Sequence, residues 1–329
     1  MTLDDPPGID PGLVETLREA RAVLVTTHRS PDGDALGSAL AVREILLALD
    51  KQVTVWVPRG VPAPYRFLPG SPAVTGGDDP GPGPWSCTLV VDTSEAKLLE
   101  CPLPPAERTG PVLVLDHHLS GGSLGDLVVR LPAAATGELV WALASLLGVE
   151  PTLELAECVY TAIVTDTGMF RYDLTTPHTH RISARCLELG VQPSRVAREV
   201  WEKYPQGWLR LWSELLSTIE VDMDGRLATL SVPADLLSRH GANEDALEEV
   251  VSWPRGIRGV EVAALIRYKP DGRVRVSLRS NGRVNVASLA SIFGGGGHFG
   301  AAGCDFPAGT SLDEARQRLR EELCSILDR

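Results

Sequence analysis

Val112-Leu-Val-Leu-Asp116-His117-His118 is a short apolar run that ends in one carboxylate and two imidazoles. Three similar apolar runs come before it, at residues 23–27, 53–57 and 88–91. Continuous apolar runs of this length are typical of strands buried on both faces of a parallel sheet. Helical periodicity accompanies them over residues 35–49, 135–147 and 153–164. The first half of the chain is therefore predicted to be an α/β domain with a parallel sheet.

A smaller α/β domain with a mixed sheet is predicted for the second half. Strand-like runs cover residues 226–232, 260–266 and 273–278, and residues 268–273 predict a hairpin turn between the last two. We expect Thr310 to cap an amphipathic helix that runs to Leu327, and Thr136 to cap the helix over residues 135–147. A polar helical pattern over residues 177–204 suggests a connection between the domains. The predicted limits are 1–187, a helical linker over 188–206, and 207–329.

Composition limits the functions that the chain can have. Of 329 residues, 43% are hydrophobic and 22% charged, which excludes disorder and collagen-like repeats. No apolar run reaches the roughly 18 residues of a membrane helix, and the acidic N-terminus lacks the order of a signal peptide. The six cysteines form no C-x-x-C pair, as expected of reduced thiols. We therefore expect a cytoplasmic protein without a membrane partner.

The net charge of −12 argues against binding long duplex nucleic acid, which requires many phosphates to be neutralised. Between Val250 and Gly303, however, eight basic residues face only two acidic ones. This local excess indicates either a solvated strand face or a limited anion site for one or a few phosphates. Phe293-Gly-Gly-Gly-Gly-His298 lies in the same segment, and its glycines would let backbone amides approach an anion closely.

Acidic or mixed acidic and histidine clusters follow three predicted strands and end one helix. They are His28, Asp32 and Asp34; Asp92; Asp116, His117 and His118; and Asp166. Ligands collect outside the carboxyl ends of strands in an open α/β sheet. Each cluster alone is explained by an ordinary cap or turn, but carboxylates gathered at one sheet edge repel one another unless cations neutralise them. Their joint placement predicts a metal site.

The ligand types point to the metal. Mixed carboxylate and imidazole ligands favour manganese, with magnesium or cobalt as alternatives. A structural zinc site would require thiolates, and no cysteine falls in these clusters. The carboxylates outnumber the ligands that one ion requires, which suggests two ions that share a ligand. Two ions about 3.5–4 Å apart form the clamp used for displacement at phosphorus.

These motifs together resemble the DHH phosphoesterases, a family named for the triplet that is Asp116-His117-His118 here. The segment from Gly294 to His298, with Ala301-Ala302-Gly303, is similar to the signature of the family's C-terminal DHH-associated domain. The nanoRNase and pAp-phosphatase branch matches best in length. Membership would imply manganese-dependent hydrolysis of short single-stranded RNA to mononucleotides, and removal of the 3′-phosphate from 3′-phosphoadenosine 5′-phosphate (pAp) to leave AMP.

The resemblance also implies residue roles. One ion would be held by His28, Asp32 and Asp92, and the other by Asp34, Asp92, His117 and Asp166, so that Asp92 bridges both. The catalytic residues would be His118, Asp116 and Asp92, with His118 facing the substrate phosphate and Asp116 orienting its neighbours. Substrate binding would involve His118, Arg279, Ser280, Gly295, Gly296, Gly297 and His298.

Other interpretations remain open from the sequence. The family also contains phosphodiesterases of cyclic di-AMP or its linear dinucleotide product, and a nucleotide-binding regulator with a decayed metal site ranks lower. Relatives often carry an Asn where this chain has Gly121, which leaves the preferred substrate open. Relatives are often dimers, so a homodimer is also left open.

Overall fold

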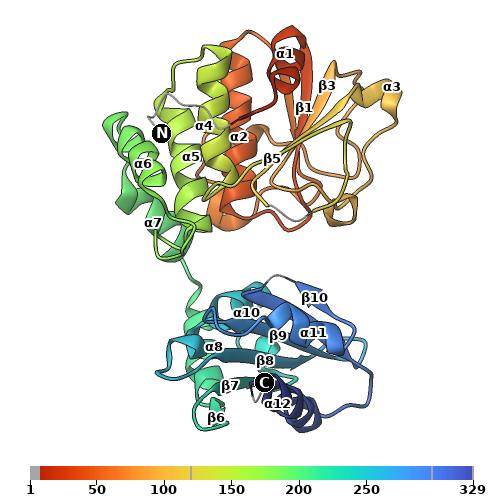
Figure 1. The fold of residues 1–329 in the computed structure, drawn as a ribbon, viewed down its shortest axis with the longest axis vertical. Helices are drawn as coiled ribbons and strands as arrows, with labels where there is room; N and C mark the ends of the chain where they lie inside the picture. Colours follow the sequence, from red (N-terminus) through yellow and green to blue (C-terminus); the bar gives the residue numbers. More distant parts are fainter. Residues whose placement is uncertain (1–7, 119–120, 298, 328–329) are drawn as a thin grey trace. The chain divides into compact units, whose positions relative to one another are not determined.

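The structure is a computed structural model that describes residues 8–118, 121–297 and 299–327. The chain forms two compact units, the first ending at Lys203 and the second beginning at Tyr204 (Figure 1). Among the helices that the structure describes, none has the length and apolar character required to cross a bilayer.

The first unit contains a five-stranded sheet in which all neighbouring strands are parallel. In spatial order the strands are β2 (Gln52–Trp56), β1 (Ala22–Thr26), β3 (Cys87–Val91), β4 (Val112–Asp116) and β5 (Leu127–Arg130). The four predicted strands are therefore confirmed. The fifth, β5, was not predicted from the sequence, because it is a four-residue edge strand that is only partly buried and has just three consecutive apolar residues.

Helices α2 (Gly33–Ala48) and α4 (Thr136–Leu147) pack against strands of this sheet, and α5 (Leu153–Asp166) packs against both helices (Figure 1). They bury a continuous apolar core with the strands. Leu24, Trp56 and Trp85 form a smaller apolar cluster. The remaining short elements are α1 (Pro11–Glu19), α3 (Ala106–Thr109) and three 3₁₀ turns at Ala63–Tyr65, Ser71–Ala73 and Ala96–Leu98.

Helices α6 (Pro177–Glu188) and α7 (Pro193–Trp201) cover most of the segment that we expected to connect the domains. Both helices are amphipathic, and Ile182 and Val196 are fully buried in the core of the first unit. The apolar side of each helix thus joins them to this unit, and the division of the chain falls after α7.

The second unit is built on a mixed sheet, as predicted, which has six strands where the sequence indicated three. In spatial order its strands are β10 (Gly296–Gly297), β11 (Ala301–Phe306), β9 (Val274–Ser280), β8 (Val262–Tyr268), β7 (Leu227–Val232) and β6 (Glu220–Asp222). The helices are α8 (Gln206–Leu216), α9 (Leu236–Arg239), α10 (Asp245–Val250), α11 (Val286–Ile292) and α12 (Leu312–Leu327), with a 3₁₀ turn at Trp253–Gly256. Separate apolar clusters hold α11 and α12, and α8 to α10, against the sheet.

Two short sequence motifs in this unit predicted a hairpin turn and a helix cap. The hairpin between β8 and β9 is present, closed by a hydrogen bond from the Lys269 N–H to the Arg273 carbonyl. The cap of α12 is a correction, since the Ser311 hydroxyl, and not that of Thr310, accepts the N–H of Glu314 at 3.0 Å. Thr310 is buried one residue earlier, so the capping residue is displaced by one position.

Candidate active site

The loop after β1 carries the first predicted cluster to the carboxyl edge of the sheet. Asp32 is the N-cap of α2, and its Oδ1 accepts the N–H of Ala35 at 3.0 Å. Asp34 lies in the first turn of α2 and is buried, with 1% of its surface exposed. The chain order of the sheet reverses between β1 and β3, which is where ligands bind in folds of this type.

Asp92 directly follows β3 and meets the β1 loop. Its backbone has a φ of +62°, a left-handed conformation that Asp tolerates better than most residues. Its carboxylate is buried, and its Oδ2 lies 3.3 Å from Nε2 of His28. Strained backbone of this kind persists only where the surroundings fix it, and it gathers at functional sites.

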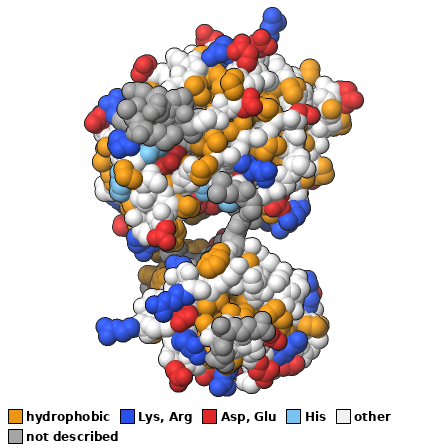
Figure 2. Space-filling model, in the orientation of Figure 1, with side chains coloured by type: hydrophobic (Ala, Val, Ile, Leu, Met, Phe, Trp, Pro, Cys, Tyr) orange, Lys and Arg blue, Asp and Glu red, His pale blue; other side chains and the backbone are white. Residues whose placement is uncertain are grey.

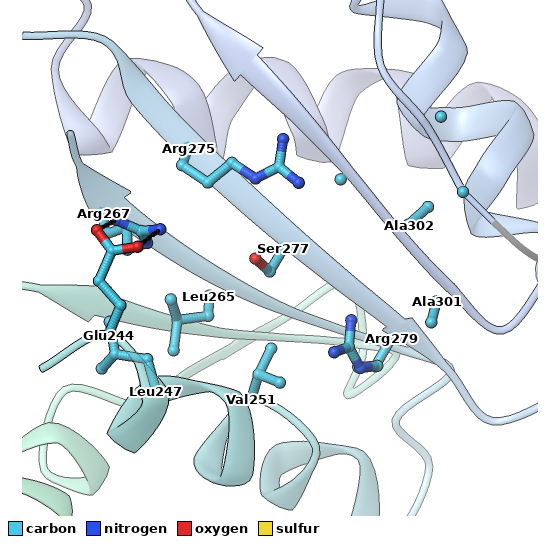
Figure 3. A pocket seen from close by; sticks show the side chains of 13 residues that line it. Glu244, Leu247, Val251, Leu265, Arg267, Arg275, Ser277, Arg279, Ala301 and Ala302 are labelled. Carbon is cyan, nitrogen blue, oxygen red and sulfur yellow. Dashed lines mark hydrogen bonds and ion pairs between the residues drawn. The ribbon is translucent and has the colours of Figure 1, made fainter. Parts of the chain in front are cut away.

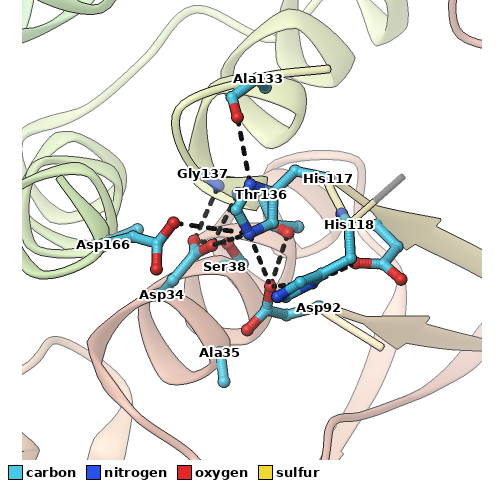
Figure 4. Close-up of polar contacts among 12 residues, drawn as sticks. Asp34, Ala35, Ser38, Asp92, His117, His118, Ala133, Thr136, Gly137 and Asp166 are labelled. Atoms are coloured by element: carbon cyan, nitrogen blue, oxygen red, sulfur yellow. Dashed lines mark hydrogen bonds and ion pairs between the residues drawn. The ribbon is translucent and has the colours of Figure 1, made fainter. Parts of the chain in front are cut away.

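His117 lies at the centre of the carboxylates (Figure 4). Its Nε2 is 3.4 Å from Oδ2 of Asp166, 3.6 Å from Oδ1 of Asp92 and 3.8 Å from Oδ2 of Asp34. Nδ1 lies 3.1 Å from the carbonyl oxygen of Ala133, which can only accept, so Nδ1 carries the proton. Nε2 is then a lone-pair donor, and it is buried without a hydrogen-bond partner among the described residues.

His118 is held differently from its neighbour. Both its backbone N–H and its Nδ1 contact Oδ1 of Asp116, at 3.1 Å and 2.8 Å. Burial raises the pKa of the Asp116 carboxyl, but these hydrogen bonds outweigh burial and leave that pKa below its ordinary value. Asp116 is therefore an ionised carboxylate that fixes the orientation of the His118 ring.

The electrostatics of the cluster call for a cation. Burial raises the pKa of Asp34 and of Asp92, and nearby carboxylates add to the rise for both. Burial, and then Asp34 and Asp32, raise the pKa of Asp166 to about 8. Burial lowers the pKa of His28, which favours the neutral imidazole that metals bind. A bound cation would remove the mutual repulsion of these carboxylates.

The structure brings all six predicted metal ligands into two compact groups, whose ligand atoms lie within 4.8 Å of one another. One group contains His28, Asp32 and Asp92, and the other contains Asp34, His117 and Asp166. A third group that meets the same distance limit contains Asp92, His117 and His118. Oxygen and imidazole ligands of this kind, with an unpartnered Nε2 between carboxylates, fit a divalent metal ion. These side chains can therefore hold a metal, although their individual roles remain predictions.

Sequence reasoning missed the residues that support these carboxylates. Asp34 accepts hydrogen bonds from the N–H groups of Thr136 and Gly137, at 2.7 Å and 3.0 Å, and from the Ser38 hydroxyl at 3.0 Å. Thr136 does not cap α4, because Ala135 occupies the N-cap position. The helical periodicity that starts at residue 135 predicted α4. No local pattern indicated that the N–H of Thr136 donates to Asp34, 102 residues earlier in the chain.

A second candidate site lies on the sheet of the second unit. It is a cavity of about 320 Å³ (Figure 3). Alternate residues of β9 place Arg275, Ser277 and Arg279 on the cavity side, while Leu278 and Ser280 face the core. The remaining lining comes from Glu244, Leu247, Val251, Leu265, Arg267, Gly296, Gly297, Ala301, Ala302 and Gly303.

Only some of the predicted substrate-binding residues line this cavity. Arg279, Gly296 and Gly297 line it, whereas Gly295 and Ser280 do not. Ser280 is buried, and its hydroxyl accepts the N–H of Gly282. His298 lies outside the described residues. Because residues two and four positions apart on a strand share a face, Ser277 and Arg275 were recognisable from their spacing to Arg279.

Acidic side chains partly neutralise the basic segment. Arg267 forms a two-pronged ion pair with Glu244, at 2.6 Å and 2.8 Å. Arg275 lies 3.3 Å from Asp305. On the face drawn in Figure 2, acidic and basic side chains are interspersed on both units, without a continuous basic band among the residues described. The positive charge is therefore local, which suits a small anion better than a long phosphate backbone.

Two family models match the chain. The "DHH family, N-terminal domain" covers residues 22–163, and the "DHHA1 domain" covers residues 224–325. With two groups of metal ligands at the strand ends and a second unit on a mixed sheet, the chain has the features of a metal-dependent hydrolase. It belongs to the DHH family, as its resemblance predicted.

Individual relatives agree with this assignment. The bifunctional oligoribonuclease and PAP phosphatase NrnA of Thermus thermophilus is 36% identical over 93% of this chain and 90% of that protein. The crystal structure of an exopolyphosphatase-related protein from Bacteroides fragilis matches with a TM-score of 0.86 and 26% identity, over 97% of both chains. The cyclic-di-AMP phosphodiesterase PdeA of Listeria monocytogenes is 25% identical over 94% of this chain but 48% of that protein.

Proposed function

We propose that this protein is a manganese-dependent phosphoesterase that hydrolyses short RNA to mononucleotides and converts pAp to AMP. The observation that carries the proposal is the convergence of two ligand groups on Asp92, whose Oδ2 faces His28 and whose Oδ1 faces His117. A carboxylate with one oxygen toward each group is suited to bridge two ions. The 36% identity to an oligoribonuclease and PAP phosphatase supports the choice of substrate.

In this proposal the two ions use the ligands that the sequence suggested. One would be held by His28, Asp32 and Asp92, and the other by Asp34, Asp92, His117 and Asp166. The first group is supported by the 3.3 Å approach of His28 to Asp92. The second is supported by the buried Nε2 of His117, whose Nδ1–H donates to Ala133 and so fixes the ring for coordination. A ligand set rich in carboxylates and without sulfur favours manganese over zinc.

When bound, two such ions would supply an activated water and stabilise the charge that develops on phosphate oxygens. The side chains perform the remaining tasks. Asp116 contacts Nδ1 of His118 and orients the ring, whose Nε2 would face a substrate phosphate oxygen. The water would lose a proton as its oxygen bonds to phosphorus, and the ribose oxygen would take up a proton as its bond to phosphorus breaks, so that the protons balance.

The cavity of the second unit would bind the nucleotide. Arg275, Ser277 and Arg279 offer charged and hydroxyl donors from one strand, and Gly296 and Gly297 leave backbone accessible beside them. Leu247, Val251 and Leu265 supply an apolar wall that suits a base. Hydrogen-bond donors that suit a phosphate thus lie beside an apolar surface that suits a base, which is the arrangement that one nucleotide requires. A volume of about 320 Å³ leaves little room for more, which supports a short substrate.

A second candidate is hydrolysis of cyclic di-AMP or its linear dinucleotide, which the 25% identity to PdeA favours. That relative is about twice as long as the part matched here, and its identity is lower than that of the oligoribonuclease. We therefore rank this activity second.

A substrate panel tests the proposal. The full chain would be assayed with manganese on diribonucleotides, pAp, cyclic di-AMP, its linear dinucleotide and pyrophosphate, with Asp92→Asn as the inactive control for contaminating enzymes. We expect the highest kcat/KM on diribonucleotides and pAp. Preferential hydrolysis of cyclic di-AMP would support the second candidate, and activity on pyrophosphate alone would contradict both.

A further inference from the structure

Thr136 contacts one carboxylate from each metal-ligand group. It is the first residue of α4 and is fully buried. Its N–H donates to Oδ2 of Asp34 at 2.7 Å, and its hydroxyl donates to Oδ1 of Asp92 at 2.9 Å (Figure 4). A single residue therefore joins side chains that come from the first turn of α2 and from the end of β3.

The residues around Thr136 reach further ligands of the same cluster. Ala133 accepts the Nδ1–H of His117, and the N–H of Gly137 donates to Oδ1 of Asp34 at 3.0 Å. Glu138 closes the turn, because its Oε2 accepts the N–H of Ala134. The turn over residues 133–137 thus contacts Asp34, Asp92 and His117, which are half of the six proposed metal ligands.

The Thr136 hydroxyl has no role in capping its own helix. Ala135 is the N-cap of α4, and no side chain caps that end by a hydrogen bond. The first N–H groups of α4 are instead satisfied by Asp34, a residue of another helix. Since the hydroxyl donates to Asp92, its contribution goes to the orientation of that carboxylate.

We propose that Thr136 is a positioning residue that presets the spacing of the two metal-ligand groups. The hydroxyl fixes the rotation of the Asp92 carboxylate, so that Oδ2 remains 3.3 Å from His28 while Oδ1 remains 3.6 Å from His117. The N–H holds Asp34 relative to the same helix end. The inference rests on the proposed function, because it concerns how the proposed manganese ligands are held.

Three variants separate the hydroxyl from the shape of the side chain. Thr136→Val removes the donor and keeps the volume, and Thr136→Ser restores the donor without the methyl group. Thr161→Val is the matched control, since Thr161 is equally buried in the first unit but its hydroxyl bonds only the Glu157 carbonyl. Manganese affinity would be measured by calorimetry on the metal-free full chain, together with melting temperature in EDTA and kcat.

We expect Thr136→Val to weaken manganese affinity roughly 10- to 100-fold, the range found when a partner of a metal ligand is removed. Thr136→Ser and Thr161→Val should remain within a few fold of the wild type. A purely structural role would lower the melting temperature and leave the manganese affinity unchanged. Should the valine variant not fold, Thr136→Cys, which keeps only a weak S–H donor, should show a smaller loss in the same direction.

Two results would overturn the inference while leaving the proposed function intact. One is wild-type manganese affinity in a folded Thr136→Val or Thr136→Cys protein. The other is equal weakening in Thr136→Val and in Thr136→Ser, which keeps the hydroxyl, because this would assign the effect to the packing of the side chain. A wild-type chain that binds no manganese at all would instead refute the proposed function, and this inference with it.

Discussion

Asp166→Asn should make the metal-free protein more stable, although it removes a proposed metal ligand. In the folded chain without metal, burial and the charges of Asp34 and Asp32 raise the pKa of Asp166 to about 8. The same carboxyl in an unfolded chain has a pKa near 3.9, and each unit of difference corresponds to about 1.4 kcal/mol. Ionised Asp166 therefore costs the folded state roughly 3–6 kcal/mol at pH 9.

The sign of the pH dependence follows from proton binding. Between about pH 4 and pH 8 the folded state keeps the Asp166 proton that the unfolded chain has released. The free energy of unfolding therefore falls as pH rises through this range, and it becomes level above pH 8. Asparagine carries no charge, so Asp166→Asn should avoid this cost. Its gain in the free energy of unfolding should be about 3–6 kcal/mol at pH 9 and only about 1–2 kcal/mol at pH 5.

Thermal unfolding in EDTA at pH 5 and pH 9 measures this effect. For a unit of this size, 1 kcal/mol corresponds to roughly 2–4 °C, so we expect a gain near 10 °C at pH 9. Saturating manganese should reverse the order, because only the wild type would be stabilised by strong binding. The exposed Asp173 provides the control, as Asp173→Asn should change neither curve. A variant no more stable than the wild type at pH 9 in EDTA would refute the reasoning.

Asp92→Ala should abolish turnover and manganese binding while leaving the circular dichroism spectrum unchanged, and a variant with near-normal activity would contradict the two-metal assignment. Arg279→Ala should raise KM about 10- to 100-fold, the equivalent of losing one charge-assisted phosphate contact, at unchanged manganese affinity. If Arg279→Ala also lost manganese, this would argue against the division in which the first unit binds the metal and the second binds the nucleotide. Gly137→Ala would place a Cβ 2.6 Å from that of Ala162, so α4 should shift and manganese affinity should fall. Gly256→Ala, which meets no atom within 4 Å, should have no such effect.

The parallel sheet could be predicted because its main strands are buried over their whole length. β3 is buried at every position, so its sequence is a continuous apolar run. The ligands could be grouped because parallel strands end at a common edge, which places Asp92 near Asp116 without any knowledge of side-chain contacts. The same logic failed for β5, whose edge position leaves it only partly buried.

Tertiary partners could not be inferred from local pattern. Thr136 is a residue type that often caps helices and lies at the start of α4. Its hydroxyl nevertheless donates to Asp92, 44 positions earlier in the chain. The resemblance implied that both Arg279 and Ser280 bind substrate, but successive residues of a strand face opposite sides, and Ser280 faces the core. Gly121 shows a further limit, because a Cβ there would lie 2.1 Å from the Ser94 hydroxyl, a contact between distant segments.

The dependence of cleavage rate on RNA length tests the central claim most directly. Single-turnover rates would be measured with manganese on ribonucleotides from dimer to twenty-mer, using the full chain. The cavity of about 320 Å³ and the local, partly neutralised basic charge predict the highest rates for about two to four residues and a steep decline beyond them. Rates that stay equal or rise toward the twenty-mer would contradict the account, because they would require an extended surface for single-stranded RNA.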